Sequence, residues 1–312
     1  MAVIDVGSNT LRLLIGCFHE GRIVRMRQER SVTRLGQNIQ RAGSLNKEGI
    51  KKSIRILASF KEILNEYGAL PVIAVGTSAL REAIDSRSFI ERAREETGIG
   101  IEIISGEREA ELTLKGLRGD ILHGTAQKPD IIVDLGGGST EIIVCGDGMS
   151  KGSIPIGAVK LFDLFLHSDP PTAEELHKAI QHVYKEINRY ILKNNLRSVL
   201  LNSGELIATG GTATTVAAID LGLGTYDGER VHHHRITYLA LKTLHAKLSG
   251  MTVAERAGIR GMGPDRADII VPGILILLIL MEIMKKNRIT ISDYGLLEGI
   301  LSEGQSSLMG RG

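Results

Sequence analysis

Hydrophobic and polar positions change period repeatedly along the chain, and this pattern predicts alternating strands and helices. β-branched residues flank small-residue turns in residues 3–17 and again in residues 132–145. This is typical of a β-hairpin, because only small or turn-forming residues accept the backbone angles of the bend. Apolar residues at helical spacing follow each hairpin, between further short apolar runs. The pattern therefore predicts two copies of one α/β unit.

The expected elements follow a similar order in both copies. After the first hairpin, the pattern predicts a strand over 22–28, a helix over 46–67, a strand over 70–75, a helix over 89–97, a strand over 101–104 and a helix over 107–117. After the second hairpin, it predicts a strand over 149–155, a long helix from a Thr172/Glu175 capping box to Asn194, a strand over 206–208, a helix after Gly210, an apolar helix over 269–284, a strand over 289–292 and a terminal helix from Tyr294.

A stretch with little periodicity, over residues 119–128, separates the two copies. We therefore expect one domain over residues 1–123 together with about 294–312, and a second domain over 124–293. Two lobes joined by few crossings tend to hinge, and the neighbourhoods of Gly119 and Asp293 are the expected hinge points.

Charge and cysteine content narrow the class of protein. The 38 Lys and Arg nearly balance the 36 Asp and Glu, and no basic stripe stands out, so we expect no nucleic-acid partner. Cys17 and Cys145 fall in different copies, which argues against a disulfide and favours a reducing, cytoplasmic location. The first residues lack the pattern of a secretory signal. The apolar residues 269–284 are too few to span a bilayer, so we expect a buried core helix and no membrane partner.

The turn of the second hairpin has the composition of a phosphate-binding loop. Residues 136–140 (Gly-Gly-Gly-Ser-Thr) can point consecutive backbone N–H groups at phosphate oxygens. Asp134 and Glu141 flank this turn, and a carboxylate beside a phosphate is repelled unless a cation bridges them. The sequence therefore predicts that Asp134 and Glu141 hold Mg²⁺ or Mn²⁺. A plain hairpin is the alternative, but Asp5 and Asp134 lead matching turns in both copies.

Seven segments resemble the signature blocks of the Ppx/GppA phosphatases, a family within the actin, hexokinase and Hsp70 superfamily. They run from about residue 2 to about residue 303, and their combination is highly specific: AVIDVGSNTLRLLIG, AVGTSALREA, EIISGEREAEL, IIVDLGGGSTEIIV, SIPIGAVKL, ATGGTATTVAA and SDYGLLEGI. The resemblance implies an α/β fold of two ribonuclease-H-like (actin-like) domains with mixed five-stranded sheets, and an active site in the interdomain cleft.

The resemblance also implies which residues bind phosphate and metal. Both hairpin loops would hold phosphates, and Mg²⁺ would lie in the cleft, at Asp134 and Glu141. The implied phosphate-binding residues are Asp5, Gly7, Ser8 and Asn9 in the first loop, Gly136, Gly137, Gly138 and Ser139 in the second, and Gly211 and Thr212 in the sixth block.

Glu109, Arg81 and Glu141 are the catalytic residues that the resemblance implies. Glu109 matches the glutamate that the family uses to activate the attacking water, and Arg81 matches its phosphate-binding arginine. In-line attack on a phosphoanhydride needs a base on one side and cations that spread charge on the other. From the residues alone, Glu109 is better interpreted as a carboxylate at a helix N-terminus, and only the motif match distinguishes it from Glu107 and Glu111. For Arg81, an exposed charge at a helix start is the alternative.

Two positions depart from the family pattern, and one run of histidines invites a metal-site interpretation. Asp85 stands where an asparagine is usual, and Leu297 stands where many members have arginine, which puts substrate preference in doubt. In the run 232–234 (His-His-His), consecutive residues on an extended segment would point to opposite faces. We therefore interpret these histidines as solvated or anion-contacting side chains, with a transition-metal site as the alternative.

The expected activity is hydrolysis of terminal phosphoanhydride bonds of polyphosphate with release of orthophosphate, by an exopolyphosphatase. The alternative substrate is guanosine pentaphosphate (pppGpp). A kinase of the same superfamily, with residues 210–212 as an adenosine contact, and a non-catalytic anion sensor are further alternatives. The sequence leaves chain-length preference and oligomeric state open, with a homodimer as one alternative.

Overall fold

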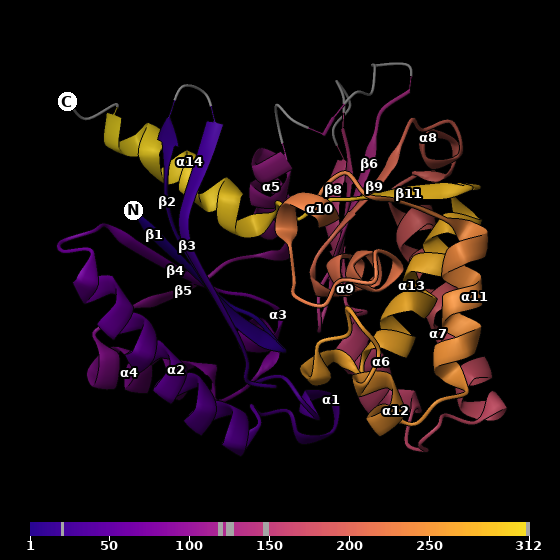
Figure 1. The fold of residues 1–312 in the computed structure, drawn as a ribbon, viewed down its shortest axis with the longest axis horizontal. Helices are drawn as coiled ribbons and strands as arrows, with labels where there is room; N and C mark the ends of the chain where they lie inside the picture. The colour runs from indigo at the N-terminus through magenta and orange to yellow at the C-terminus, as the bar shows by residue number, and fades with distance from the viewer. Residues whose placement is uncertain (20–21, 118–120, 123–127, 146–149, 310–312) are drawn as a thin grey trace. The chain divides into compact units, whose positions relative to one another are not determined.

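The computed structural model describes residues 1–19, 22–117, 121–122, 128–145 and 150–309, and the chain divides into two compact units (Figure 1). The first unit consists of Met1–Arg118 and Tyr294–Gly312, and the second consists of Gly119–Asp293. The hinge point expected near Gly119 lies outside the described residues.

The first unit contains a mixed sheet with the strand order β3-β2-β1-β4-β5. β2 pairs antiparallel with both β1 and β3, whereas β1, β4 and β5 run parallel. The carboxyl ends of these three parallel strands therefore lie at one edge, which is where ligands usually bind to such sheets. The strands are β1 (Ala2–Val6), β2 (Thr10–His19), β3 (Arg22–Val32), β4 (Val72–Gly76) and β5 (Ile101–Ile103).

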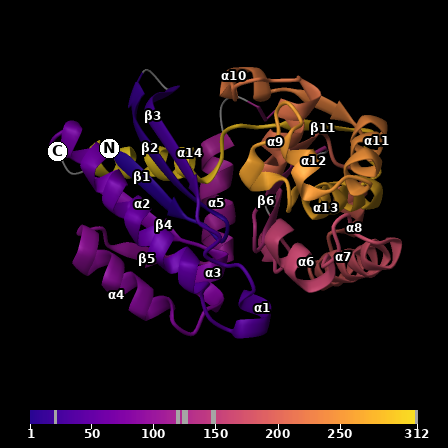
Figure 2. The same ribbon diagram turned by 60° about the horizontal axis from the view of Figure 1, so that its bottom comes forward.

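Helices pack on both faces of this sheet (Figure 2). On one face, Ile4 and Leu13 belong to an apolar cluster with Leu57 of α2, and α4 contributes Phe89. On the other face, residues of β1 and β2 cluster with α5 and α14. Burial on both faces explains the nearly continuous apolar sequence of β1. The helices are α1 (Ile39–Ala42), α2 (Lys47–Glu66), α3 (Ser78–Glu82), α4 (Ser86–Thr97), α5 (Gly106–Leu117) and α14 (Leu296–Met309).

Helices α5 and α14 of the first unit pack so closely that their backbones are nearly in contact. A Cβ atom built on Gly116 would overlap the carbonyl group of Gly295, and one built on Gly299 would overlap the carbonyl group of Leu112. Only glycine at these positions permits the observed approach of the two helices. The short Gly295–Gly299 segment thus determines how α14 lies against α5.

The second unit contains a sheet with the strand order β10-β11-β9-β6-β7-β8, which among the described residues is one strand more than expected. The additional strand, β10, pairs antiparallel with β11. It is three residues long and buries only Ile236, so it has no periodicity that a sequence pattern could reveal. The strands are β6 (Ile131–Leu135), β7 (Thr140–Val144), β8 (Ser150–Ile154), β9 (Leu206–Thr209), β10 (Arg235–Thr237) and β11 (Arg288–Ile291).

The helices of the second unit confirm the two strongest helix predictions. The side chain of Thr172 caps α7 in a reciprocal capping box with Glu175. Helix α13 is buried along nearly its whole length, as expected for a core helix. The helices are α6 (Ala158–Phe165), α7 (Ala173–Lys193), α8 (Arg197–Leu201), α9 (Gly211–Asp220), α10 (Gly228–Val231), α11 (Tyr238–Ser249), α12 (Val253–Ala257) and α13 (Ile270–Ile283), with a 3₁₀ turn, η1 (Pro264–Arg266).

The structure bears on two features noted in the sequence, the two cysteines and the apolar helix. Cys17 and Cys145 lie in different units and neither forms a disulfide. Within the described part of the chain, no helix is both long and apolar enough to cross a bilayer.

His245 of α11 should make the stability of the second unit depend on pH. Its Nε2 atom is buried and accepts or donates no hydrogen bond within the described residues. Burial and the nearby charge of Arg256 lower the pKa of His245 to about 4. The unfolded chain binds this proton at about pH 6.5, so the free energy of unfolding is highest above that pH. It should fall by about 1.4 kcal/mol per pH unit as the pH drops from about 6.5 towards 4.

Urea unfolding at several pH values between those limits measures this effect. The variant His245→Gln should show a shallower dependence than the wild type. The matched variant His177→Gln, at an exposed position of α7, should keep the wild-type slope. Equal slopes in His245→Gln and the wild type would contradict the assignment.

Candidate active site

The loop after β1 is a tight turn held by backbone hydrogen bonds. The amide of Gly7 donates a hydrogen bond to the carbonyl of Thr10 across the turn (3.1 Å). The carbonyl of Ser8 accepts from the amide of Gly36 (2.8 Å). Because the C=O and N–H groups of a trans peptide point in opposite directions, the amide of Asn9 points away from Gly36. The loop is thus held by its carbonyl side, with an amide on the opposite side.

Asp5, which leads this loop, is paired with an arginine. It lies opposite Arg12 in the β1–β2 register, so both side chains lie on the same face of the sheet. The Nη2 and Nε atoms of Arg12 donate to Asp5 Oδ2, at 2.7 and 2.9 Å. The negative charge of this buried aspartate is therefore compensated within the first unit.

Arg81 and Glu109, the two catalytic candidates of the first unit, are in direct contact. Arg81 lies in α3, directly after β4, and Glu109 lies in the first turn of α5, after β5. The Nη1 atom of Arg81 donates to Glu109 Oε2 (2.7 Å) and to the carbonyl of Ile104 (3.0 Å). Glu109 is buried, with 8% of its surface exposed, and Arg81 is not the exposed charge of the simpler interpretation. The Arg81 guanidinium compensates a carboxylate that would otherwise be costly to bury.

The loop after β6 repeats the first loop closely. The amide of Gly136 donates to the carbonyl of Ser139 (3.0 Å), as Gly7 does to Thr10. The carbonyls of this loop are held by the first turn of α6: Ala158 donates to Gly136 (3.1 Å), and Val159 donates to Gly137 (2.9 Å). By the same peptide geometry, the amides of Gly137 and Gly138 point away from α6.

A row of polar residues crosses the second sheet at this edge. Thr209, Asp134, Glu141 and Ser153 lie in register on β9, β6, β7 and β8. Asp134 and Glu141 are both buried, and Ser153 Oγ donates to Glu141 Oε1 (2.7 Å). Glu141 thus occupies the position that Arg12 occupies in the first unit. The first unit places a cation opposite its leading aspartate in the strand register, and the second places another carboxylate there.

Two adjacent carboxylates repel each other unless a cation lies between them, so this pair fits a divalent metal. Among the described residues, no cluster of three or more His, Cys, Asp or Glu forms a metal site. A pair of carboxylates still fits Mg²⁺, because this ion usually takes one or two carboxylates from the protein and completes its coordination shell with water and substrate phosphate. Asp134 and Glu141 are the residues that would hold it.

Gly211 and Thr212 begin α9, directly after Gly210, which lies next to Asp134. A Cβ atom on Gly210, whose φ is +93°, would lie 2.9 Å from Asp134 Oδ1. The side chain of Thr212 packs against Gly273 of α13 and is 2% exposed. Any contact of Thr212 with phosphate would therefore use its backbone amide, not its hydroxyl.

Three neighbours of the site were not among the sequence-predicted residues. They are Arg12 beside Asp5, Ser153 beside Glu141, and Arg266, whose guanidinium lies where a side chain at Gly211 would be. The duplicated hairpin could have revealed Arg12, because the register of a hairpin follows from its turn. Ser153 lies on β8, outside that hairpin. Arg266 lies in a 3₁₀ turn with no sequence signal for its position.

The two departures from the family pattern have local roles. Leu297 is 5% exposed and packs in the apolar cluster with Val3 and Leu14, so this position is part of the core between the sheet and α14. Asp85 precedes α4, and its Oδ1 accepts from the amide of Leu45 (2.9 Å). An asparagine could accept the same hydrogen bond, so this departure changes little within the first unit.

The three consecutive histidines do not form an extended segment, and that expectation was wrong. His232 ends α10, and His233 has a φ of +65°, so the chain turns here. His232 Nδ1 accepts from the amide of Asp293 (3.2 Å), and His234 Nε2 lies 2.7 Å from Asp220 Oδ2. The turn sends the side chains of His232 and His234 to different partners, and the ring centroid of His233 lies 4.2 Å from that of His232.

Comparison with known proteins places these observations in a family. Residues 15–307 match the Ppx/GppA phosphatase family. Exopolyphosphatase 2 of Mycobacterium tuberculosis is 32% identical over 315 residues, which covers 96% of this chain and 97% of that protein. The crystal structure of an exopolyphosphatase from Cytophaga hutchinsonii is 29% identical, covers 98% of this chain and 97% of its own, and superposes with a TM-score of 0.86. The Aquifex aeolicus PPX-GPPA enzyme is 31% identical, with 97% and 98% coverage and a TM-score of 0.77.

Together, the fold and these similarities define a phosphoanhydride hydrolase of the actin-like fold, which confirms the expected fold class and enzyme class. The chain belongs to the Ppx/GppA phosphatase family.

Proposed function

We propose that this protein is an exopolyphosphatase, which removes orthophosphate from the end of inorganic polyphosphate with Mg²⁺ as cofactor. The relatives named exopolyphosphatase support the choice of substrate. The observation that carries the proposal is the contrast between the two sheet edges. At the edge of the first sheet, the buried Glu109 accepts a hydrogen bond from Arg81. At the edge of the second sheet, Asp134 and Glu141 lie opposite each other beside a glycine-rich loop.

In the proposed reaction, Glu109 accepts a proton from the attacking water, and the water oxygen bonds to the terminal phosphorus. The bond from that phosphorus to the bridging oxygen breaks, and the shortened chain leaves with the bridging oxygen. Arg81 holds Glu109 in place and carries a positive charge for the phosphoryl oxygens. The outward amides of Asn9, Gly137 and Gly138 bind phosphate oxygens. Mg²⁺ held by Asp134 and Glu141 would neutralise developing charge.

Phosphate release from long-chain polyphosphate, tripolyphosphate, pppGpp and ATP, with and without Mg²⁺, tests this proposal. We expect the highest kcat/KM on a polyphosphate, and loss of activity on chelation that Mg²⁺ or Mn²⁺ restores. Preference for pppGpp would instead assign the protein as a guanosine pentaphosphate phosphohydrolase.

Two variants test whether the second unit holds the metal ion. Asp134→Asn removes one carboxylate of the second unit and should raise the Mg²⁺ concentration needed for half-maximal activity. The control Asp227→Asn removes a carboxylate that caps α10 and should leave that concentration unchanged. A wild-type Mg²⁺ requirement in Asp134→Asn would refute the metal assignment.

A further inference from the structure

The first unit contains a cavity that the proposed reaction does not use. It has a volume of about 390 Å³, within the range of ordinary small-molecule sites. It lies between the sheet and the helices α5 and α14. Among the described residues, most of its lining is apolar, and charged side chains occur at three positions: Met1, Pro71, Ile73, Val75, Ile104, Leu112, Ile300 and Gly304, with Glu102, Arg108 and Glu303.

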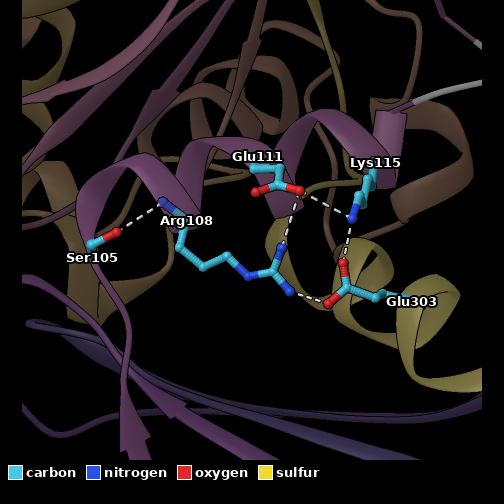
Figure 3. A network of polar contacts seen from close by, with 5 residues as sticks. All are labelled: Ser105, Arg108, Glu111, Lys115 and Glu303. Atoms are coloured by element: carbon cyan, nitrogen blue, oxygen red, sulfur yellow. Dashed lines mark hydrogen bonds and ion pairs between the residues drawn. The ribbon is translucent and has the colours of Figure 1, made fainter. Parts of the chain in front are cut away.

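Two of the charged residues belong to a closed network that joins α5 to α14 (Figure 3). Arg108 and Lys115 of α5 each form ion pairs with both Glu111 and Glu303. The two positive and two negative charges of this network balance. Burial alone would lower the pKa of Arg108, but its hydrogen bonds with Glu303 and Glu111 leave that pKa raised above the ordinary value.

Glu303 is the carboxylate that any anionic ligand would have to displace. Its pKa is lowered, because hydrogen bonds from Lys115 and Arg108 outweigh the effect of burial. A ligand with a carboxylate or phosphate would compete with a group already held by two cations. The network therefore disfavours anionic ligands in this cavity.

Glu102 is the charged lining residue outside the network. It lies opposite Val75 in the β4–β5 register, on the same face of the sheet as the cavity. Glu102 is exposed, and in the described part of the chain its side chain has no hydrogen bond or ion pair, so it is the carboxylate at the cavity that no cation holds. A positively charged group placed there would gain a partner without displacing another.

From the cavity and its charges, we propose that this site binds a small molecule with an aliphatic body and a single ammonium group. The aliphatic body lies against Ile73, Leu112 and Ile300, and the ammonium group pairs with Glu102. Burial of the body supplies most of the binding free energy, and Glu102 supplies the preference for a cation. The site lies on the helix that carries Glu109, but its occupation does not depend on the proposed reaction.

Calorimetric titration of the full chain with hexylammonium, hexanol and hexanoate tests the proposal. These probes share one aliphatic body and differ in the charge of the head group. Hexylammonium should bind at one site, at least about threefold more tightly than hexanol, as a partly exposed ion pair provides. Hexanoate should bind more weakly than either. No saturable binding, or tighter binding of hexanoate, would overturn the proposal.

Three variants locate the site. Glu102→Gln should bring the affinity for hexylammonium down to that for hexanol, whereas the exposed control Glu95→Gln on α4 should leave both affinities unchanged. Ile73→Phe adds volume within the cavity and should weaken hexylammonium and hexanol together. A preference for the ammonium that survives in Glu102→Gln would place the bound molecule elsewhere. Because the readout is binding, its outcome is independent of any phosphatase assay.

Discussion

Glu109→Gln should lower kcat for phosphate release from polyphosphate by about 10²- to 10⁴-fold, with little change in KM. The amide has nearly the same shape as the carboxylate but cannot accept a proton from water. Its Oε1 atom can still accept a hydrogen bond from Arg81, so the contact seen between α3 and α5 is preserved in part. The loss should therefore fall on the chemical step. Steady-state kinetics on long-chain polyphosphate measures it.

The neighbouring Glu107 provides a matched control for this prediction. It lies in the same first turn of α5 but is exposed. Glu107→Gln should leave kcat unchanged, and calorimetry should show that Glu109→Gln still binds polyphosphate. If Glu109→Gln kept more than about a tenth of the wild-type kcat, a role as general base would be excluded. Unchanged activity with unchanged binding would favour a non-catalytic anion sensor.

Gly299→Leu should destabilise the first unit by about 3 kcal/mol or more. The Cβ atom alone would overlap the carbonyl group of Leu112, and neither backbone can move without separating α14 from α5. Separation would also open the ion-pair network between Glu303 and α5. Urea unfolding followed by circular dichroism measures the change in the free energy of unfolding.

Gly100→Leu is the control for this prediction. A Cβ atom added to Gly100 would meet no other atom within 4 Å, and the residue does not have a positive φ, so a side chain fits there without strain. The midpoint of unfolding should stay near that of the wild type. Equal stability of Gly299→Leu and Gly100→Leu would show that the close packing of α5 and α14 does not stabilise the first unit.

The elements that could be predicted from the sequence depend on interactions between near neighbours. The two aspartate-led hairpins follow from turn residues flanked by β-branched runs, and both form with the same turn hydrogen bond. The Thr172/Glu175 capping box involves groups three residues apart. Helix α13 follows from a continuous apolar run of helical length. In each case the stabilising contacts lie within the segment whose pattern was recognised.

Family resemblance added what these local patterns did not contain. Glu107, Glu109 and Glu111 are alike in type and lie on one helix, so the residues alone did not distinguish Glu109. The structure distinguishes it by contact, because Arg81 from α3 reaches Glu109. That contact requires β4 and β5 to be neighbours in the sheet, which depends on the packing of the whole unit.

Side-chain pairings between distant segments needed the folded chain. Arg12 compensates Asp5 while Glu141 faces Asp134, because the register of each hairpin places these residues side by side. The burial of Leu297 and the cavity beside Glu102 likewise arise where α14 packs on the sheet. Local hydrogen bonding and steric preference act within a few residues and leave a sequence pattern. Charge compensation and cavity shape depend on which distant segments meet, so they become visible only once the strands and helices are packed.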